Sequence, residues 1–393
     1  MLDDFNICDY DEKKIVLCGA GVVGTFISRK LDEQGIDNYI FCDINPTNNT
    51  EDVRKVISYE ELLSVNASYY IISSERFFHE ITTRLIALGI EKNRIFSAAT
   101  LMQKNNTSST FPSKYIEAAL KERASLRDML YIHHLDLTIT EHCTLRCKNC
   151  ANLVTYYQNP CSFTDCEVIH NFDVLLSADI CIGGVTLLGG EPLTNQRLVR
   201  KILQRYRGNS KIGHFVIYTN GTIVPNKETI DAVHEYERCY FVFSKYNGLS
   251  NKLDACINLM QEENICYTIL DDDNSPWWSY GIPKHYTSRN AVDTQKMFDE
   301  CYEVRSCHCP VLLKEKFSFC NRIAHGMNVG IIPQNPDNFV DLSDYASGKY
   351  SPSEITSKIK TYLEIKHYPS GCEYCDIDTE LTVERAVQVS STT

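Results

Sequence analysis

The sequence predicts an α/β protein in which two successive units of parallel β-sheet, each covered by helices, precede a small cysteine-rich segment. Short apolar runs alternate with helix-length segments, a polar stretch follows residue 100, and the 393 residues exceed the size of one typical domain. The content of 43% hydrophobic and 23% charged residues is typical of a globular protein. We expect folded units at 1–105, 135–300 and 301–393, with a linker helix at 106–134.

The first unit begins with a short apolar run at 13–18 that ends in a glycine-rich loop, as buried parallel strands often do. Further strands are expected at 38–42, 69–73 and 94–96, and helices at about 22–34 and 76–88. This alternation predicts a parallel sheet with covering helices.

The glycine-rich loop fits the pattern G-x-G-x-x-G with Gly19, Gly21 and Gly24, and Asp43 follows at the end of the next strand. In a Rossmann unit such glycines admit a pyrophosphate to the helix N-terminus, and the acidic residue binds the ribose. The segment is about half of a full dinucleotide fold, and it resembles the small Rossmann-like domains of polysaccharide- and sugar-modifying proteins. We predict a Rossmann-like domain that either binds a nucleotide or keeps these glycines for packing of helix on strand.

The second unit follows a polar linker at 103–110. Leu120, Leu126 and Leu130 then recur at helical spacing, which predicts a connecting helix up to His133. Strands separated by helix-length segments suit a partial (β/α)6 barrel. These strands are expected at 135–140, 185–188, 214–219, 240–244 and 265–270.

Charge and hydropathy exclude several classes of function. The formal net charge of −12 disfavours nucleic acid as a partner. No apolar run reaches the roughly 18 residues of a membrane span, and residues 1–10 carry acidic groups where a signal peptide carries basic ones. We therefore expect a cytoplasmic protein without membrane association. In a reducing compartment, 18 cysteines indicate metal binding rather than disulfides.

Three of these cysteines, Cys143, Cys147 and Cys150, form a C-x3-C-x2-C loop directly after the strand predicted at 135–140. Three thiolates on one tight loop can point at a common centre, which suits an iron–sulfur cluster or zinc. Three protein ligands leave a further coordination position open for a substrate or cofactor.

This cysteine loop resembles the signature of the radical S-adenosylmethionine (SAM) superfamily. Gly189, Gly190 and Glu191 end the next predicted strand as the GGE motif of that superfamily does, and Asn220 lies in a TNG motif at the end of the third. One departure is Asn149, which stands where many members carry an aromatic residue near the adenine.

The resemblance implies that the three cysteines hold a 4Fe–4S cluster whose fourth iron chelates SAM. It also implies that Gly189, Gly190 and Glu191 accept the SAM amino group on backbone carbonyls, with Asn220 and Ser244 as further cofactor contacts. Reduction by a donor such as flavodoxin or ferredoxin would then release a 5′-deoxyadenosyl radical that abstracts hydrogen from the substrate. Such a radical requires a dry, closed pocket.

A second group of cysteines lies near the end of the sequence. A predicted hairpin at 311–319 brings its two flanking thiols together, and a C-x2-C pair supplies two more. This set resembles the twitch subtype, a shortened SPASM domain with one auxiliary 4Fe–4S cluster. The implied ligands are Cys309, Cys320, Cys372 and Cys375, with Cys307 as the alternative to Cys309 and zinc as the alternative metal.

The remaining chemistry-bearing residues are predicted to be structural. Trp277 and Trp278 are expected to pack, and Lys245, His308 and His325 to have no ligand role. The other cysteines are expected in apolar cores, namely Cys8, Cys18, Cys42, Cys161, Cys166, Cys181, Cys239, Cys256 and Cys266.

The resemblance leads to the hypothesis of a radical enzyme that oxidises, epimerises or dehydrates a small hydroxylated metabolite, such as a sugar or nucleotide-linked sugar. The alternatives are radical modification of a ribosomally made peptide and a non-catalytic iron–sulfur protein. The Rossmann-like unit at the N-terminus, where peptide-modifying members often bear a leader-peptide-binding domain, favours the small molecule.

Overall fold

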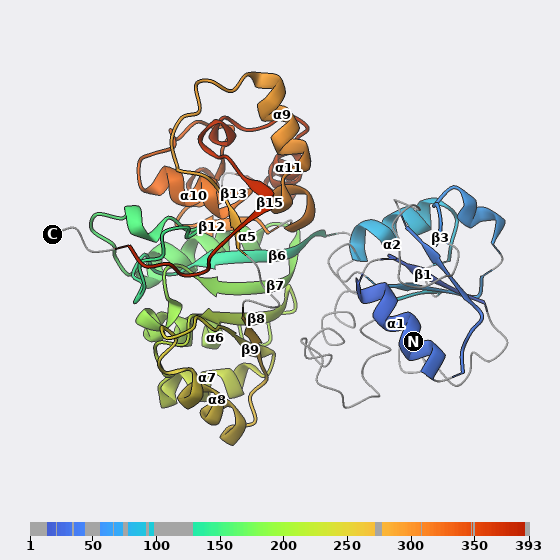
Figure 1. Cartoon of the computed structure of the whole chain (residues 1–393), viewed down its shortest axis with the longest axis horizontal. Helices are drawn as coiled ribbons and strands as arrows, with labels where there is room; N and C mark the ends of the chain where they lie inside the picture. The colour runs from blue at the N-terminus through green and yellow to red at the C-terminus, as the bar shows by residue number, and fades with distance from the viewer. Residues whose placement is uncertain are drawn as a thin grey trace. The chain divides into compact units, whose positions relative to one another are not determined.

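The computed structural model divides into two compact units, Met1–Ala124 and Ser125–Thr393 (Figure 1). It describes residues 14–20, 22–33, 35–43, 56–65, 67–73, 78–91, 94–97, 129–271, 277–307, 309–346, 348 and 350–389. Gly21, His308, Cys8 and the predicted linker helix up to residue 128 lie outside these ranges, as does the Cys307 side chain.

The first unit is a five-stranded parallel sheet with the order β3-β2-β1-β4-β5. All four predicted strands are present, whereas β3 was not predicted because it has only two residues. The strands are β1 (Ile15–Cys18), β2 (Tyr39–Cys42), β3 (Val56–Ile57), β4 (Tyr69–Ile72) and β5 (Ile95–Ser97), with helices α1 (Val22–Glu33) and α2 (Phe78–Ala87). Alternate strand residues fill two cores, one containing Val16 and Ile72 and the other Leu17 and Phe41.

The second unit is built on an eight-stranded sheet with the order β10-β9-β8-β7-β6-β12-β13-β14. The five predicted strands of the repeating part are neighbours in sequence order and all parallel. They are β6 (Leu130–Thr138), β7 (Ile180–Leu188), β8 (Ile212–Thr219), β9 (Cys239–Ser244) and β10 (Tyr267–Leu270). β10 forms one end of this sheet order, so among the described strands the sheet is open.

One prediction at the start of this sheet is wrong. Leu130 was expected in a helix that reached His133, but β6 already begins at Leu130. Leu126 and Leu130 are four residues apart, which suits a helix, whereas Leu130 and Ile132 are two apart, which suits a strand. Leu130 adopts the strand conformation because β6 pairs with β7 from Leu130↔Ile180 onward.

Helices bury one face of this sheet. Leu135, Leu137 and Ile139 share a continuous core with Phe215 and Phe241 of the neighbouring strands. Because side chains alternate along a strand, the residues between them belong to the opposite face. The connecting helices are α5 (Asn171–Ser177), α6 (Gln196–Arg205), α7 (Lys227–Tyr236) and α8 (Leu253–Glu262).

Residues 301–389 are continuous with this sheet, and several of them share its hydrophobic core. β12 (Val311–Leu313) pairs in parallel with β6, and the predicted hairpin is confirmed by its antiparallel pairing with β13 (Lys316–Ser318). The remaining elements are β11 (Trp277–Ser279), α9 (Ala291–Glu300), α10 (Asn321–Asn328), β14 (Val340–Asp341), α11 (Pro352–Leu363) and β15 (Asp378–Val383). β11 and β15 form a separate antiparallel pair.

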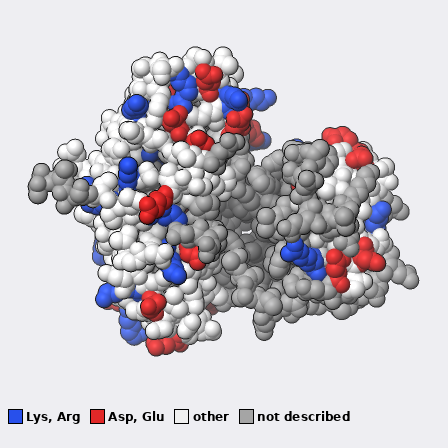
Figure 2. Space-filling model, viewed as in Figure 1, with Lys and Arg blue, Asp and Glu red and all other residues white. Residues whose placement is uncertain are grey.

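Acidic and basic side chains of the described residues are interspersed on the face that Figure 2 shows. Within the described ranges, none of the helices combines the length and the apolar character that crossing a membrane requires.

Candidate functional site

The cysteine loop is hydrogen-bonded to the turn that follows the neighbouring strand. The amide of Gly190 donates to the Thr140 carbonyl at 3.0 Å, and the amide of Glu191 donates to the His142 carbonyl at 2.7 Å. Because β6 and β7 are parallel neighbours, their carboxyl ends bring these two loops to the same edge of the sheet.

The two glycines of the turn are required for this close approach. A Cβ on Gly189 would lie 2.2 Å from the Thr140 carbonyl oxygen, and Gly189 has a φ of +151°. A Cβ on Gly190 would lie 2.2 Å from the His142 oxygen and 2.9 Å from the Cβ of Cys143. Any side chain at these positions would therefore displace the cysteine loop.

The carboxylate of Glu191 ties the ends of β7 and β8 together. It is 1% exposed and accepts hydrogen bonds from the amides of Leu193 and Asn220 and from the Thr219 hydroxyl, at 3.0, 2.8 and 2.8 Å. Burial raises its pKa to about 7, and these hydrogen bonds oppose that rise. The side chain thus has a positioning role, and only the backbone of this motif remains for a cofactor.

Two of the three motif carbonyls already accept hydrogen bonds. The Asn152 side chain donates to the Gly189 carbonyl at 2.8 Å, and Thr194 donates to the Glu191 carbonyl through its amide and its hydroxyl. The Gly190 carbonyl is therefore the best candidate for a cofactor amino group. Sequence reasoning did not identify Asn152.

The three thiols of the loop lie together in a small apolar cluster with Leu145 and Ala386. Burial raises the pKa of Cys143 to about 12 and that of Cys147 to about 11, and the thiols raise one another's pKa further. Backbone amides of residues 152–154 partly offset the effect of burial on Cys150. Three buried, mutually close sulfurs fit a group that compensates their charge with iron.

Among the described residues, no three His, Cys, Asp or Glu side chains are arranged to bind one metal ion. Thiolates of a 4Fe–4S cluster bind different irons and stand farther apart than the ligands of one ion. Three thiolates are donors that bind a 4Fe–4S cluster, so this donor set suits a cluster.

Two further predicted cofactor contacts lie at the same edge of the sheet. The Asn220 side chain donates to the Cys143 sulfur at 3.7 Å and to the Thr144 hydroxyl at 3.1 Å, so it contacts the cysteine loop directly. Ser244 ends β9, and its hydroxyl is buried beside the side chains of Tyr218 and Tyr246. Lys245, next along the chain, is exposed.

Comparison with known families addresses this region directly. A family model described as a 4Fe-4S single cluster domain matches residues 137–242, a range that contains all three cysteines of the loop. Residues 137–242 are therefore similar to 4Fe–4S single cluster domains. The match agrees with the 4Fe–4S cluster that the sequence predicts at this loop. No curated protein matches the chain.

Several solved structures are similar to this chain at low identity. BtrN in complex with AdoMet and 2-DOIA is 14% identical, with 66% of this chain and 98% of that chain covered and a TM-score of 0.40. Native anSMEcpe with bound AdoMet and the Kp18Cys peptide is 13% identical, with 59% and 84% covered and a TM-score of 0.34. HydG, a maturase of the [FeFe]-hydrogenase, is 12% identical, with 50% and 46% covered and a TM-score of 0.27.

A second group of thiols lines a cavity next to the β12–β13 hairpin. Phe319 and Cys320, which directly follow β13, are part of its wall. Four cysteines from three segments, Cys301, Cys320, Cys372 and Cys375, contribute to its wall. Three of them were predicted as ligands of an auxiliary cluster. Cys301 was not predicted, because it lies eight residues before Cys309, and Cys309 is not among the residues that line the cavity.

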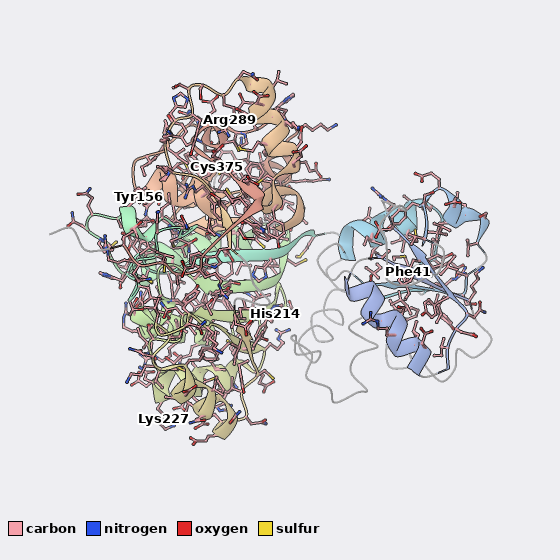
Figure 3. All side chains as sticks on the ribbon, in the orientation of Figure 1. Phe41, Tyr156, His214, Lys227, Arg289 and Cys375 are labelled. Atoms are coloured by element: carbon pink, nitrogen blue, oxygen red, sulfur yellow. The ribbon has the colours of Figure 1, made fainter. Side chains whose placement is uncertain are left out.

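Two arginines donate hydrogen bonds to backbone carbonyls around this second group of cysteines. Arg289 donates to the carbonyls of Cys372 and Cys375, and Figure 3 labels Arg289 and Cys375. Arg322 is 5% exposed, lines the cavity, and donates to the Gly281 carbonyl at 2.7 Å. Burial raises the pKa of the Cys150 and Cys375 thiols, and the Arg322 guanidinium opposes that rise in both. Arg322 is therefore close to both groups of cysteines.

The glycine-rich loop of the first unit makes close contacts within that unit. A Cβ on Gly24 would lie 2.0 Å from the Gly19 carbonyl oxygen, so this glycine is needed where the helix meets the strand. The Asp43 carboxylate accepts a hydrogen bond from the Ala20 amide at 2.7 Å. These contacts favour the packing interpretation, and nucleotide binding stays a prediction.

The remaining cysteines differ in how far they are exposed. Cys161 and Cys166 are exposed, so their predicted core positions are wrong, because both follow the cysteine loop on a surface segment. Cys266 is half-buried, and the core prediction is confirmed for Cys18, Cys42, Cys181, Cys239 and Cys256.

The predicted structural histidine and tryptophans are engaged in packing contacts. His325 is buried, which lowers its pKa to about 3, and it contacts the Tyr157 hydroxyl at 2.7 Å. Trp277 packs edge-on against Tyr246, and Trp278 packs against Tyr302.

The face of the sheet opposite the helices is polar. His134 and Asp136 of β6 share it with Thr186 of β7 and His214 of β8, and Asp136 is paired in register with Thr186 (His214 is labelled in Figure 3). The Thr138 hydroxyl and the His214 Nδ1 are buried without a hydrogen-bond partner among the described residues. Orphaned polar atoms of this kind indicate a face that receives a polar ligand.

Replacing Asp136 with Asn is expected to stabilise the second unit at high pH. Burial raises the pKa of Asp136 from 3.8 to about 7, although Asn321 donates a hydrogen bond to it. The carboxyl ionises at lower pH in the unfolded chain than in the folded one, so folding becomes less favourable as the pH rises from about 4 to 7. The gain should be small near pH 4 and reach at most about 4 kcal/mol at pH 8.

Urea unfolding followed by tryptophan fluorescence measures this gain, because the two tryptophans of the chain, Trp277 and Trp278, lie in the second unit. An equal gain at pH 4 and pH 8 would contradict the assigned pKa shift.

Proposed function

We propose that the chain is a radical SAM enzyme that abstracts hydrogen from a small hydroxylated metabolite, such as a sugar or a nucleotide-linked sugar. The observation that carries the proposal is the cysteine loop, fastened to the Gly189–Gly190 turn at the edge of a sheet whose free face is polar. Parallel sheets bind their ligands at this carboxyl edge.

In this proposal Cys143, Cys147 and Cys150 hold a 4Fe–4S cluster, and the Gly190 carbonyl accepts the SAM amino group. A reduced cluster held by these cysteines would supply the electron for cleavage of SAM bound beside it, and with it the chemistry of hydrogen abstraction from the substrate. Asn220 positions Cys143 through its 3.7 Å contact with the sulfur. Glu191 holds the glycine turn and the end of β8 at a constant separation through its three hydrogen bonds.

The polar face of the sheet would bind the substrate. Thr138 presents an orphaned hydroxyl and Ser244 a buried one at the carboxyl ends of β6 and β9, and Asp136 offers a carboxylate whose side chain is 13% exposed. Hydroxyl and carboxylate groups form directed hydrogen bonds with a polyhydroxylated ligand. This composition favours a polar small molecule over an apolar peptide side chain.

The proposal is tested by incubating the anaerobically reconstituted, dithionite-reduced protein with SAM. We expect 5′-deoxyadenosine and methionine from the wild type and from Cys166→Ala, which removes an exposed thiol, but not from Cys143→Ala. A wild type that produces no more 5′-deoxyadenosine than Cys143→Ala would overturn the assignment.

The substrate class is tested with deuterated candidates in the same assay. Transfer of deuterium into 5′-deoxyadenosine from a sugar or nucleotide sugar supports the proposal, whereas transfer only from a peptide would move the function to the alternative class.

We further propose an auxiliary 4Fe–4S cluster in the cavity lined by Cys301, Cys320, Cys372 and Cys375. The two cysteine sets differ only in Cys301 and Cys309, so alanine variants of these two residues discriminate between them. The cavity lining supports Cys301, and Cys301→Ala should lose about four irons per chain while Cys309→Ala keeps them. Iron analysis and electron paramagnetic resonance of the reduced protein measure this difference, and the reverse result would restore Cys309 as the ligand.

A further inference from the structure

Residues 385–389, which we call the strap, run along the cysteine loop as a short antiparallel strand. The Lys148 amide donates to the Val387 carbonyl at 2.8 Å, and the Val389 amide donates to the Arg146 carbonyl at 2.9 Å. Cys147 and Gln388 face each other in the resulting bridge. In Figure 1 the strap belongs to the red segment that follows β15.

The strap also buries part of the loop. Ala386 is 2% exposed and packs with Leu145 and Cys147, which are 9% and 7% exposed. The Arg385 guanidinium lies over the ring of Tyr246, 5.0 Å from its centroid. Contacts on both sides of Ala386 therefore fix the strap in position.

The side chain of Gln388 uses both ends of its amide at this contact. Its Nε2 lies 3.3 Å from the Cys147 sulfur and 2.7 Å from the Ala386 carbonyl, and it donates to both. Its Oε1 accepts from the Arg146 amide at 2.7 Å. These bonds orient an N–H donor toward one of the three sulfurs of the loop.

A hydrogen bond to a cluster sulfur stabilises the reduced state, which carries more negative charge, and thus raises the reduction potential. We propose that Gln388 is a positioning residue for the cluster of the cysteine loop. It orients the loop through its bond with the Arg146 amide, and its N–H bond to the Cys147 sulfur raises the reduction potential of the cluster. This inference rests on the cluster assigned under the proposed function. It does not depend on turnover, because its test uses neither SAM nor substrate.

The test compares the midpoint potential of this cluster in the wild type, Gln388→Glu and Gln388→Met. The glutamate keeps an acceptor for the Arg146 amide but has no N–H group, and the methionine is a neutral chain of similar length. We expect both variants to have a lower potential, with the reduction equilibrium shifted by up to about tenfold, or 59 mV for one electron. Glu384→Gln, at an exposed position just before the strap, should leave the potential unchanged.

Cys301→Ala can serve as the background, so that the titration follows one cluster. A shift in Gln388→Glu alone would mean that added charge acts without the hydrogen bond, and it would overturn the tuning role. Unchanged potentials in both variants would overturn it too. A methionine variant that keeps native tryptophan fluorescence but takes up no iron would support the positioning role, because the strap would then be needed for loading.

Discussion

Gly190→Ala is expected to abolish the cluster of the cysteine loop. The added methyl group would lie 2.2 Å from the His142 carbonyl oxygen and 2.9 Å from the Cβ of Cys143. Neither neighbour is a flexible side-chain end, so the backbone that carries the first cysteine must move, and the bond from the Glu191 amide to His142 must break. We expect iron at this site to fall below about a tenth of the wild-type content of roughly four per cluster, and SAM cleavage to fall with it.

Iron and sulfide analysis, together with electron paramagnetic resonance, measures this loss against Cys143→Ala as the reference for an empty site. Gly208→Ala is the matched control. Gly208 has a φ of +70° but nothing within 4 Å of an added Cβ, so it incurs backbone strain without touching the loop. A Gly190→Ala protein with a full cluster would show that the close approach of the two loops is not required.

Glu191→Ala is expected to destabilise the second unit by about 3 to 6 kcal/mol. Removal of the carboxylate leaves two amides and the Thr219 hydroxyl unpaired in a site where Glu191 is 1% exposed. Each buried donor left without a partner costs roughly 1–3 kcal/mol. Glu191→Gln keeps one acceptor oxygen and should lose about half as much stability.

Anaerobic urea unfolding followed by fluorescence of Trp277 and Trp278 measures this loss in the second unit. Glu262→Ala, at an exposed position at the end of α8, should change stability by no more than about 0.5 kcal/mol. A Glu191→Ala protein as stable as this control would show that water satisfies the three donors and that the carboxylate is dispensable for the fold.

These predictions assign different roles to the glycines and to the glutamate of the GGE motif. The glycines admit the cysteine loop, and the glutamate fastens β7 to β8, so all three residues act on the geometry of the site. In the proposed function, the Gly190 carbonyl is the part of the motif that accepts the SAM amino group. Loss of the cluster and loss of stability should therefore separate between the variants of Gly190 and Glu191.

The sequence alone predicted the parallel strands, the loop of three cysteines and the two motifs that meet it. Strand and helix periodicity are local properties, and three cysteines within eight residues share one loop whatever the rest of the chain does. Local periodicity failed at Leu130, where it was ambiguous, at the two-residue strand β3, and in the C-terminal segment, where β11, β14 and β15 were not predicted.

Tertiary structure decided which distant groups complete these sites. Cys301 reaches the second cavity in a position that hairpin spacing assigned to Cys309, and Gln388 reaches Cys147 across 241 residues of chain. The Glu191 carboxylate, to which the sequence assigned no role, joins two strands. Contacts of this kind depend on how elements pack, and residues so far apart in sequence share no spacing from which the contact could be inferred.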